Sequence, residues 1–304
     1  MENLIYLVAP IFLVILLGII LKSILISDEK IWYQINRLTY WILFPALLFN
    51  KTSVVDLEGF AIGLFSASMM LGYLVAVLIA YVVSKMYGMS AASLSSVIQG
   101  GGRHNSFIAL AVISQFFGEQ GEIVGALAVA VMVSFSNILT VIFMTSILSD
   151  TGKGKPSVIS EILRNPFILA IAAGLAFNFL GWDHLPVFHD FTTYLGKAAL
   201  PLALICVGAG LQFVNMRKFI APCIIASMSK MVILPATVFA AAKYFELPPI
   251  MSVSAVIFAS VPTSSTAYAL AKYMGGDAPL MAAIISLQTV LSVFTIPLII
   301  LLVS

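Results

Sequence analysis

Long apolar stretches separated by short polar connections run along the whole chain. Each of ten stretches is long enough to cross a hydrocarbon core of about 30 Å as a helix. The stretches cover residues 4–25, 30–50, 58–85, 90–117, 121–149, 158–180, 190–213, 217–243, 248–274 and 277–303. The pattern predicts an all-α membrane protein with ten transmembrane helices, numbered 1 to 10 in chain order.

Composition supports a lipid environment. Hydrophobic residues make up 61% of the chain and charged residues 9%, whereas soluble domains carry about 25% charged residues. The first apolar run, Leu4 to Leu21, lacks a basic segment before it and a small-residue cleavage site after it, which favours a retained helix over a signal peptide. The histidines and cysteines form no ligand cluster, so we expect no metal site, disulfide or cofactor. The bilayer and a small solute are the expected partners, and nucleic acid is not.

Loop charge predicts the orientation, because cytoplasmic loops are enriched in Lys and Arg. With the N-terminus outside, nine basic residues lie in or near cytoplasmic loops and two lie in outer loops. The nine are Lys22, Lys30, Lys85, Lys153, Lys155, Arg164, Arg217, Lys218 and Lys272, and the two are Lys51 and Lys243. We therefore expect a multi-pass protein of the plasma (inner) membrane, with both termini extracytoplasmic and a cytoplasmic loop at residues 150–157.

The two halves of the chain resemble each other. Pro10–Gly18 reads against Pro166–Gly174, and the same offset aligns Pro45 with Pro201. Two further pairs follow in the same order: Ala109–Ala111 with Ala269–Ala271, and Ser134–Val141 with Ser286–Val293. A repeat of five helices re-enters the membrane from the opposite side. Residues 1–149 and 158–304 are therefore predicted to be two inverted five-helix repeats, as in many secondary transporters.

Helices 4 and 9 carry helix-breaking residues at corresponding places. Helix 4 contains Gly100, Gly101 and Gly102, and glycine weakens a helix interior. Helix 9 contains Pro262, which removes a backbone donor, followed by hydroxyl residues. Paired breaks in the two halves of a transporter mark its substrate site, so we expect both helices to be interrupted and to lie side by side near the midplane.

The charges predicted inside the membrane are basic. Arg37, Arg103, Lys197 and Lys230 lie on spanning segments, whereas every Asp and Glu can be assigned to a terminus, a loop or a helix end. A central Arg is costly in lipid, so we expect Arg103, beside the break, to bind an anionic substrate. Arg37 and Lys197 are expected to snorkel to the interfaces, and Lys230 either bonds carbonyl groups or meets the substrate.

Polar neighbours of the breaks complete the expected site. The predicted substrate-binding residues are Arg103, His104, Asn105, Lys230, Thr263 and Ser264. Half-helices that start near Asn105 and Ser265 would add free N–H groups and positive dipole ends. For His104, a proton relay and a packed neutral ring both stay open. Asn137, Asn178 and Gln288 are expected to bridge helices.

Several segments resemble the auxin efflux carrier family. They are Val8–Gly18, Ile35–Leu38, Leu43–Phe49, Arg103–Ala111, Val261–Ser264 and Ala271–Tyr273. The resemblance covers the whole chain and implies the fold shared with bile acid/sodium symporters: helices 1, 2, 6 and 7 as a scaffold, and helices 3–5 and 8–10 as a transport domain in which broken helices 4 and 9 cross. It also implies elevator-type transport of organic acids such as auxin, malonate or malate. Asn105 matches a family Asn that contacts the substrate carboxylate.

Two departures from the plant members narrow the expectation. His104 stands where plant carriers have proline, which argues against auxin, and the long plant loop is reduced to Thr151–Pro156, as in a bacterial member. The alternatives are a sodium-coupled symporter of the bile acid type, a sensor, and a membrane-embedded enzyme, for which a nucleophile–base pair is lacking. Substrate identity, direction, coupling to H⁺ or Na⁺, and a monomeric or homodimeric state stay open.

Overall fold

The computed structural model describes residues 2–55, 61–148, 165–182, 185–212 and 216–303, and the regular elements in these ranges are all helical. The first half contains α1 (Glu2–Ile24), α2 (Glu29–Leu38), α3 (Phe44–Ser53), α4 (Ile62–Met86), α5 (Ala91–Gly102) and α6 (Ser106–Ile147). The second half contains α8 (Pro166–Phe179), α9 (Pro186–Ala209), α10 (Ile220–Met228), α11 (Leu234–Tyr244), α12 (Pro249–Ser260), α13 (Thr266–Met274) and α14 (Ala278–Val303). The predicted loop at 150–157 lies outside the described residues.

Short turns of other helix types join or precede some of these helices. A π-helical turn, Thr39–Leu43, connects α2 to α3, and a second, Ser229–Ile233, connects α10 to α11. A 3₁₀ turn, Met216–Phe219, precedes α10. Within α6, Gly118 has φ 59° and ψ −138°, a conformation that glycine adopts at little cost. The helix is therefore kinked there into a shorter and a longer part.

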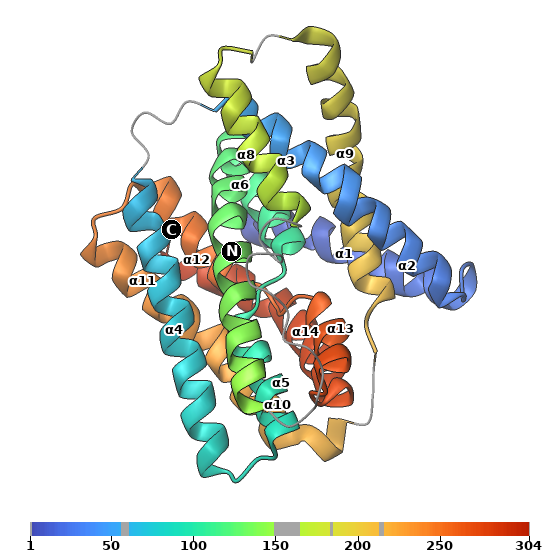
Figure 1. The fold of residues 1–304 in the computed structure, drawn as a ribbon, viewed down its shortest axis with the longest axis vertical. Coiled ribbons are helices and arrows are strands. Elements are labelled where there is room, and N and C mark those ends of the chain that lie inside the picture. Colours follow the sequence, from blue (N-terminus) through green and yellow to red (C-terminus); the bar gives the residue numbers. More distant parts are fainter. Residues whose placement is uncertain (1, 56–60, 149–164, 183–184, 213–215, 304) are drawn as a thin grey trace.

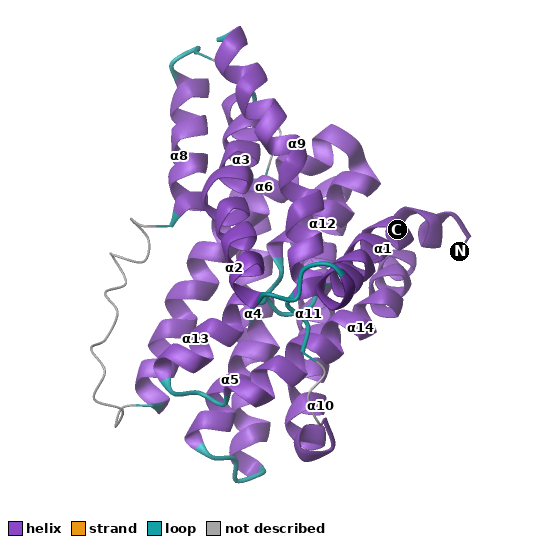
Figure 2. Ribbon diagram, turned by 90° about the vertical axis from the view of Figure 1, so that its right-hand side faces the viewer, coloured by secondary structure: helices purple, strands orange, loops and turns teal. Residues whose placement is uncertain are grey.

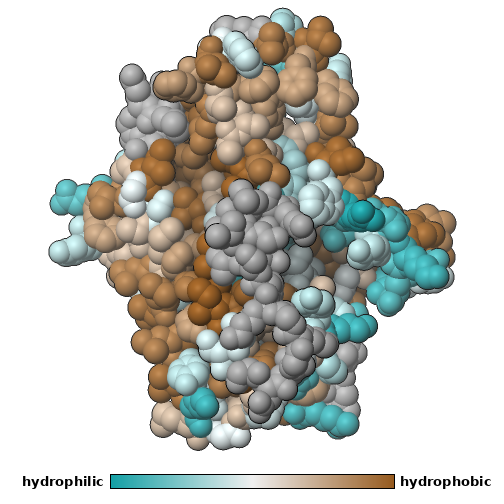
Figure 3. Space-filling view, viewed as in Figure 1, coloured by the Kyte–Doolittle hydropathy of each residue, from teal (hydrophilic) through white to brown (hydrophobic). Residues whose placement is uncertain are grey.

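The helices have the length and hydropathy of membrane spans. Six described helical runs are long and apolar enough to cross a bilayer, and two further apolar helices, α8 and α12, are shorter. Figure 3 shows hydrophobic side chains over much of the visible face, with hydrophilic ones mainly at its margins. The helical content of the described residues and the length and hydropathy of these helices confirm the prediction of an all-α, multi-pass membrane protein.

The helices form two groups that meet along α6. Helices α3, α8 and α9 lie together at one end of the molecule, and α4, α5 and α10 lie at the other (Figures 1 and 2). The first group packs as α3 against α8 and α9, with α1 against α9, whereas α4 packs against α5 and α11, and α12 against α6, α11 and α14. The chain ends lie near each other in both views.

Glycines permit close helix contacts in the first group. A Cβ added to Gly18 of α1 would overlap the carbonyl oxygen of Ile205 on α9. A Cβ added to Gly174 of α8 would overlap Thr52 and press on the carbonyl of Phe49, both on α3. Small residues let membrane helices approach until their backbones touch, so these glycines allow α1 to pack closely on α9, and α8 on α3.

Candidate substrate site

Two helix interruptions meet in the interior. Helix α5 ends at Gly102, Arg103–Asn105 are not helical, and α6 begins at Ser106. Likewise α12 ends at Ser260, and α13 begins at Thr266 after a non-helical stretch. The backbone N–H of Asn105 donates to the carbonyl of Pro262 over 2.8 Å. The two interruptions therefore lie directly against each other, and we call this junction the crossing.

Gln288 of α14 holds the crossing together. Its Oε1 accepts a hydrogen bond from the N–H of Thr263 (2.9 Å), and its Nε2 donates to the carbonyl of Gly100 (2.9 Å). The Thr263 hydroxyl donates to the same Gly100 carbonyl (2.8 Å). Gln288 and Thr263 are both fully buried. Backbone groups freed by the breaks need such partners in a membrane interior, so these bonds stabilise both interruptions at once.

Arg103 is the cation at the crossing. Its Nη2 donates to Oδ1 of Asn137 on α6 (2.8 Å) and to the hydroxyl of Thr266 on α13 (3.1 Å). Only 8% of the residue is exposed. Two neutral oxygens from different helices therefore help to fix the guanidinium plane, and a fixed fork of donors suits a carboxylate.

The start of α6 lies beside Arg103 and is capped by Asn105. The Asn105 Oδ1 accepts from the N–H groups of Phe107 (3.1 Å) and Ile108 (3.2 Å). A side-chain cap is typical at this position, since the first N–H groups of a helix have no partner within it. The side-chain oxygen is thus occupied, while the Asn105 Nδ2 bonds none of the described residues and is the group suited to an acceptor.

Two adjoining cavities contain the crossing. One has a volume of about 360 Å³ and the other about 300 Å³, and both are lined by Asn105 and Tyr40. The shared wall also includes Phe107, Ser264, Thr266 and Ala269. Arg103 and His104 line the larger cavity, and the smaller extends toward Lys22 and Glu29. Polar groups gathered in a largely apolar hollow are typical of small-molecule sites.

Three of the expected site residues take other or less direct positions. Thr263 is fully buried and forms hydrogen bonds that stabilise the crossing, and the Lys230 ammonium donates to the carbonyl of Ala259 (2.9 Å). Neither residue lines the two cavities. His104 lines the larger cavity but packs its ring against Phe258, with ring centroids 4.6 Å apart. The cavity side chains expected from sequence are therefore Arg103, His104, Asn105 and Ser264.

The glycines of the expected break are still helical. Gly100, Gly101 and Gly102 form the last turn of α5, and the non-helical residues follow them. A Cβ at Gly100 would meet Ile284, one at Gly101 would meet Ala80 and Ser229, and one at Gly102 would meet Val77 and Tyr73. Their absent side chains allow neighbouring helices to pack closely here, so they position the break without themselves unwinding.

Sequence reasoning missed part of the cavity wall. Thr266 is the first residue of α13, and its hydroxyl contacts both Arg103 and the hydroxyl of Ser264 (2.9 Å). The run of hydroxyl residues after Pro262 signals polar contacts but not which of them face the cavity. Tyr40 lies in the π-helical turn between α2 and α3 and lines the larger cavity, and no local sequence pattern marks it as a cavity residue.

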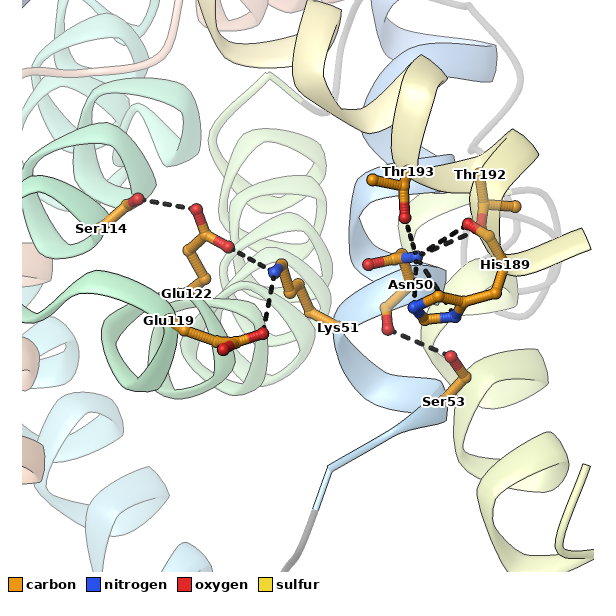
Figure 4. A network of polar contacts seen from close by, with 9 residues as sticks. All are labelled: Asn50, Lys51, Ser53, Ser114, Glu119, Glu122, His189, Thr192 and Thr193. Atoms are coloured by element: carbon orange, nitrogen blue, oxygen red, sulfur yellow. Dashed lines mark hydrogen bonds and ion pairs between the residues drawn. The ribbon is translucent and has the colours of Figure 1, made fainter. Parts of the chain in front are cut away.

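A third cavity, of about 420 Å³, lies between α3, α6 and α9. Figure 4 shows Lys51 of α3 reaching α6, where its Nζ lies 2.7 Å from Glu122 and 3.6 Å from Glu119. The neighbouring Asn50 turns to α9, and its Nδ2 donates to the Thr193 hydroxyl (2.9 Å). We call the Lys51–Glu122 pair the α3–α6 latch, since it joins the two groups of helices.

Comparison with known proteins identifies the class. Residues 152–300 match the family model described as "Membrane transport protein". The chain is 25% identical over 299 residues to an "Uncharacterized transporter" of Methanothermobacter thermautotrophicus, covering 96% of this chain and 95% of that one. It is 28% identical over 179 residues to a Rhizobium meliloti protein named "Putative malonate transporter", covering 56% of each chain.

The helical membrane fold, the interrupted helices around a polar cavity and these similarities define a multi-pass membrane transporter. Within that class, the family match and the two transporter relatives are consistent with the resemblance to the auxin efflux carrier family found in the sequence.

Proposed function

We propose that this protein is a secondary transporter of small organic anions, carboxylates or dicarboxylates such as malonate or malate, across the plasma membrane. The observation that carries the proposal is the Arg103 guanidinium in the cavity wall beside the N-terminus of α6. A fixed cation and the positive dipole end of α6 favour the same ligand charge. The name of the Rhizobium relative agrees with a dicarboxylate.

We also propose the ten-helix inverted repeat as the architecture. The described helices group into ten spans when α2 with α3, α5 with the first part of α6, α10 with α11, and α12 with α13 each count as one. The glycine contacts support this grouping. Gly18 and Gly174 are 156 positions apart, as are Phe49 and Ile205, and Gly18 faces Ile205 whereas Gly174 faces Phe49. Equivalent residues thus make equivalent contacts in the two halves.

The division of the helices supports an elevator-type movement. Predicted helices 1, 2, 6 and 7 correspond to α1, α2–α3, α8 and α9, which pack on one another and would form the scaffold. The crossing belongs to α5, α6, α12, α13 and α14, which would move as the transport domain. Tyr40 and Phe167, from the scaffold group, line the larger cavity together with Arg103, so the site lies between the two units. Sliding of one unit past the other would change the side from which the site is reached.

Substitution of Arg103 tests the substrate class. A charge-assisted hydrogen bond contributes about 1.5–3 kcal/mol, so Arg103→Ala should weaken malonate binding by roughly ten- to a hundredfold. Arg103→Lys should recover only part of the affinity, because an ammonium cannot make a planar two-point contact. The measurement is binding of radiolabelled malonate to purified protein, with other dicarboxylates and monocarboxylates as competitors.

Arg37→Ala is the matched control, because Arg37 is an exposed cation on α2 that does not line the cavities. It should bind malonate as the wild type does. Equal affinity in Arg103→Ala and wild type would show that Arg103 has a structural role and would remove the main support for an anionic substrate.

A further inference from the structure

Lys230 is a cation buried in the protein interior. It lies in the π-helical turn between α10 and α11 and is fully buried. Its Nζ donates to the carbonyl of Ala259 (2.9 Å), and none of the carboxylates in the described part of the chain forms an ion pair with it. Taking an ammonium out of water is costly without compensation. A charged Lys230 therefore needs negative potential from another source in its surroundings.

The C-terminal end of α12 supplies that potential. Ala259 is in the last turn of α12, which ends at Ser260 where the backbone becomes extended at Val261. The last carbonyl groups of a helix lack donors within the helix and carry the negative end of its dipole. The Lys230 ammonium thus binds the open end of the interrupted helix, immediately before the crossing.

In transporters built on broken helices, such C-terminal half-helix ends coordinate the coupling cation. We propose that the Lys230 ammonium is a built-in replacement for this cation, so that the transporter works without sodium. The inference rests on the proposed anion transport and specifies its coupling. It disfavours the sodium-coupled alternative on the ground that the helix end suited to sodium is already occupied.

Lys230 acts on the substrate site indirectly. It lines neither cavity at the crossing, yet its partner, the carbonyl of Ala259, lies three residues before Pro262, which joins the crossing. Lys230 is therefore a positioning residue, and its charge stabilises the end of α12 in the geometry that brings Pro262 against Asn105 (2.8 Å). A soluble cation at the same place could perform the same task if the side chain were removed.

The test compares Lys230→Ala, which removes the charge and opens space, with Lys230→Met, which removes the charge but fills the space. Malonate uptake into proteoliposomes is measured in choline, sodium and ethylammonium chloride. The wild type should be equally active in all three. Lys230→Ala should lose about tenfold or more in choline, a typical coupling between two sites, and regain activity in sodium or ethylammonium. Lys230→Met should stay low in every salt.

A second measurement needs no substrate. The thermal unfolding midpoint of purified Lys230→Ala should rise with sodium or ethylammonium, while the midpoints of wild type, Lys230→Met and Lys243→Ala, an exposed lysine at the end of α11, should not. If wild type fails to transport malonate, the proposed substrate is wrong, and the unfolding series still decides the role of Lys230. A sodium requirement in the wild type, or cation-insensitive melting of Lys230→Ala, would overturn the inference.

Discussion

Glu122→Gln should open the cavity between α3, α6 and α9 by breaking the α3–α6 latch. The Lys51 side chain is 17% exposed and the Glu122 side chain 23%, and their charged atoms lie 2.7 Å apart. The Ser114 hydroxyl also donates to Glu122 Oε1 (2.8 Å). A fully exposed pair is worth about 0.2–1 kcal/mol, and a charged hydrogen bond about 1.5–3 kcal/mol. The latch lies between these cases, at about 1–2 kcal/mol, or roughly a 5- to 30-fold change in an equilibrium.

The assay is the reactivity of one cysteine introduced at Leu200, which lines this cavity, toward a membrane-impermeant thiol reagent. Cys206 and Cys223, both buried, are replaced to remove background. Glu122→Gln should raise the labelling rate by roughly the equilibrium factor above. Glu119→Gln is the matched control, because Glu119 lies farther from Lys51 (3.6 Å) and is 77% exposed; it should change the rate less than about twofold, as expected for a weak surface pair.

A double-mutant cycle with Lys51→Met separates the latch from other effects of each substitution. The coupling free energy between Lys51 and Glu122 should reach about 1 kcal/mol, and that between Lys51 and Glu119 should be near zero. Equal labelling rates in Glu119→Gln and Glu122→Gln, or no coupling in the cycle, would show that the ion pair does not hold α3 against α6.

Two further predictions concern the crossing and the orientation. Gln288→Met should lower the thermal unfolding midpoint of the purified protein, because it leaves the buried N–H of Thr263 without its acceptor at a cost of about 1–3 kcal/mol. Gln288→Glu keeps an acceptor, so its midpoint should lie between those of Gln288→Met and the wild type. A midpoint for Gln288→Met equal to that of the wild type would contradict the role assigned to Gln288. The predicted orientation places Tyr87, an exposed residue after α4, in the cytoplasm and Tyr244, exposed at the end of α11, outside. A cysteine introduced at Tyr87 should therefore react with a membrane-impermeant thiol reagent only after permeabilisation, and one at Tyr244 should react in intact cells. The reverse pattern would show that the predicted orientation is wrong.

The positions of the helices were predictable because a helix that spans a membrane needs a long uncharged sequence. Lipid requires long uncharged runs, so the spans at 4–25 and 277–303 differ from α1 and α14 by only a few residues. The break in predicted helix 9 was also predictable from the sequence, since Pro262 has no backbone N–H to continue the helical hydrogen bonds. The kink at Gly118 was harder to predict, because a single glycine in a sequence does not show whether its φ angle is positive.

The contacts of the site could not be read from the sequence because they join residues far apart in the chain. Asn137 and Gln288 were expected to bridge helices, as they do, but their partners Arg103 and Gly100 follow only from how α6 and α14 pack. Lys230 had two open roles, and the structure gives it the carbonyl of Ala259. Periodicity identifies which residues are buried, while long-range packing decides which buried groups meet.

The crossing combines a repeated backbone with unequal chemistry. Asn105 is the N-cap of α6 and Ser265 that of α13, and these caps are 160 positions apart, the same offset that aligns Ala109 with Ala269. At that offset Arg103 aligns with Thr263, so the first half contributes a cation where the second contributes a hydroxyl. Both half-helices offer positive dipole ends, but the fixed charge lies on one side of the cavity. An anion bound there would therefore turn a carboxylate toward Arg103, which Thr266 at the start of α13 holds in place through a hydrogen bond.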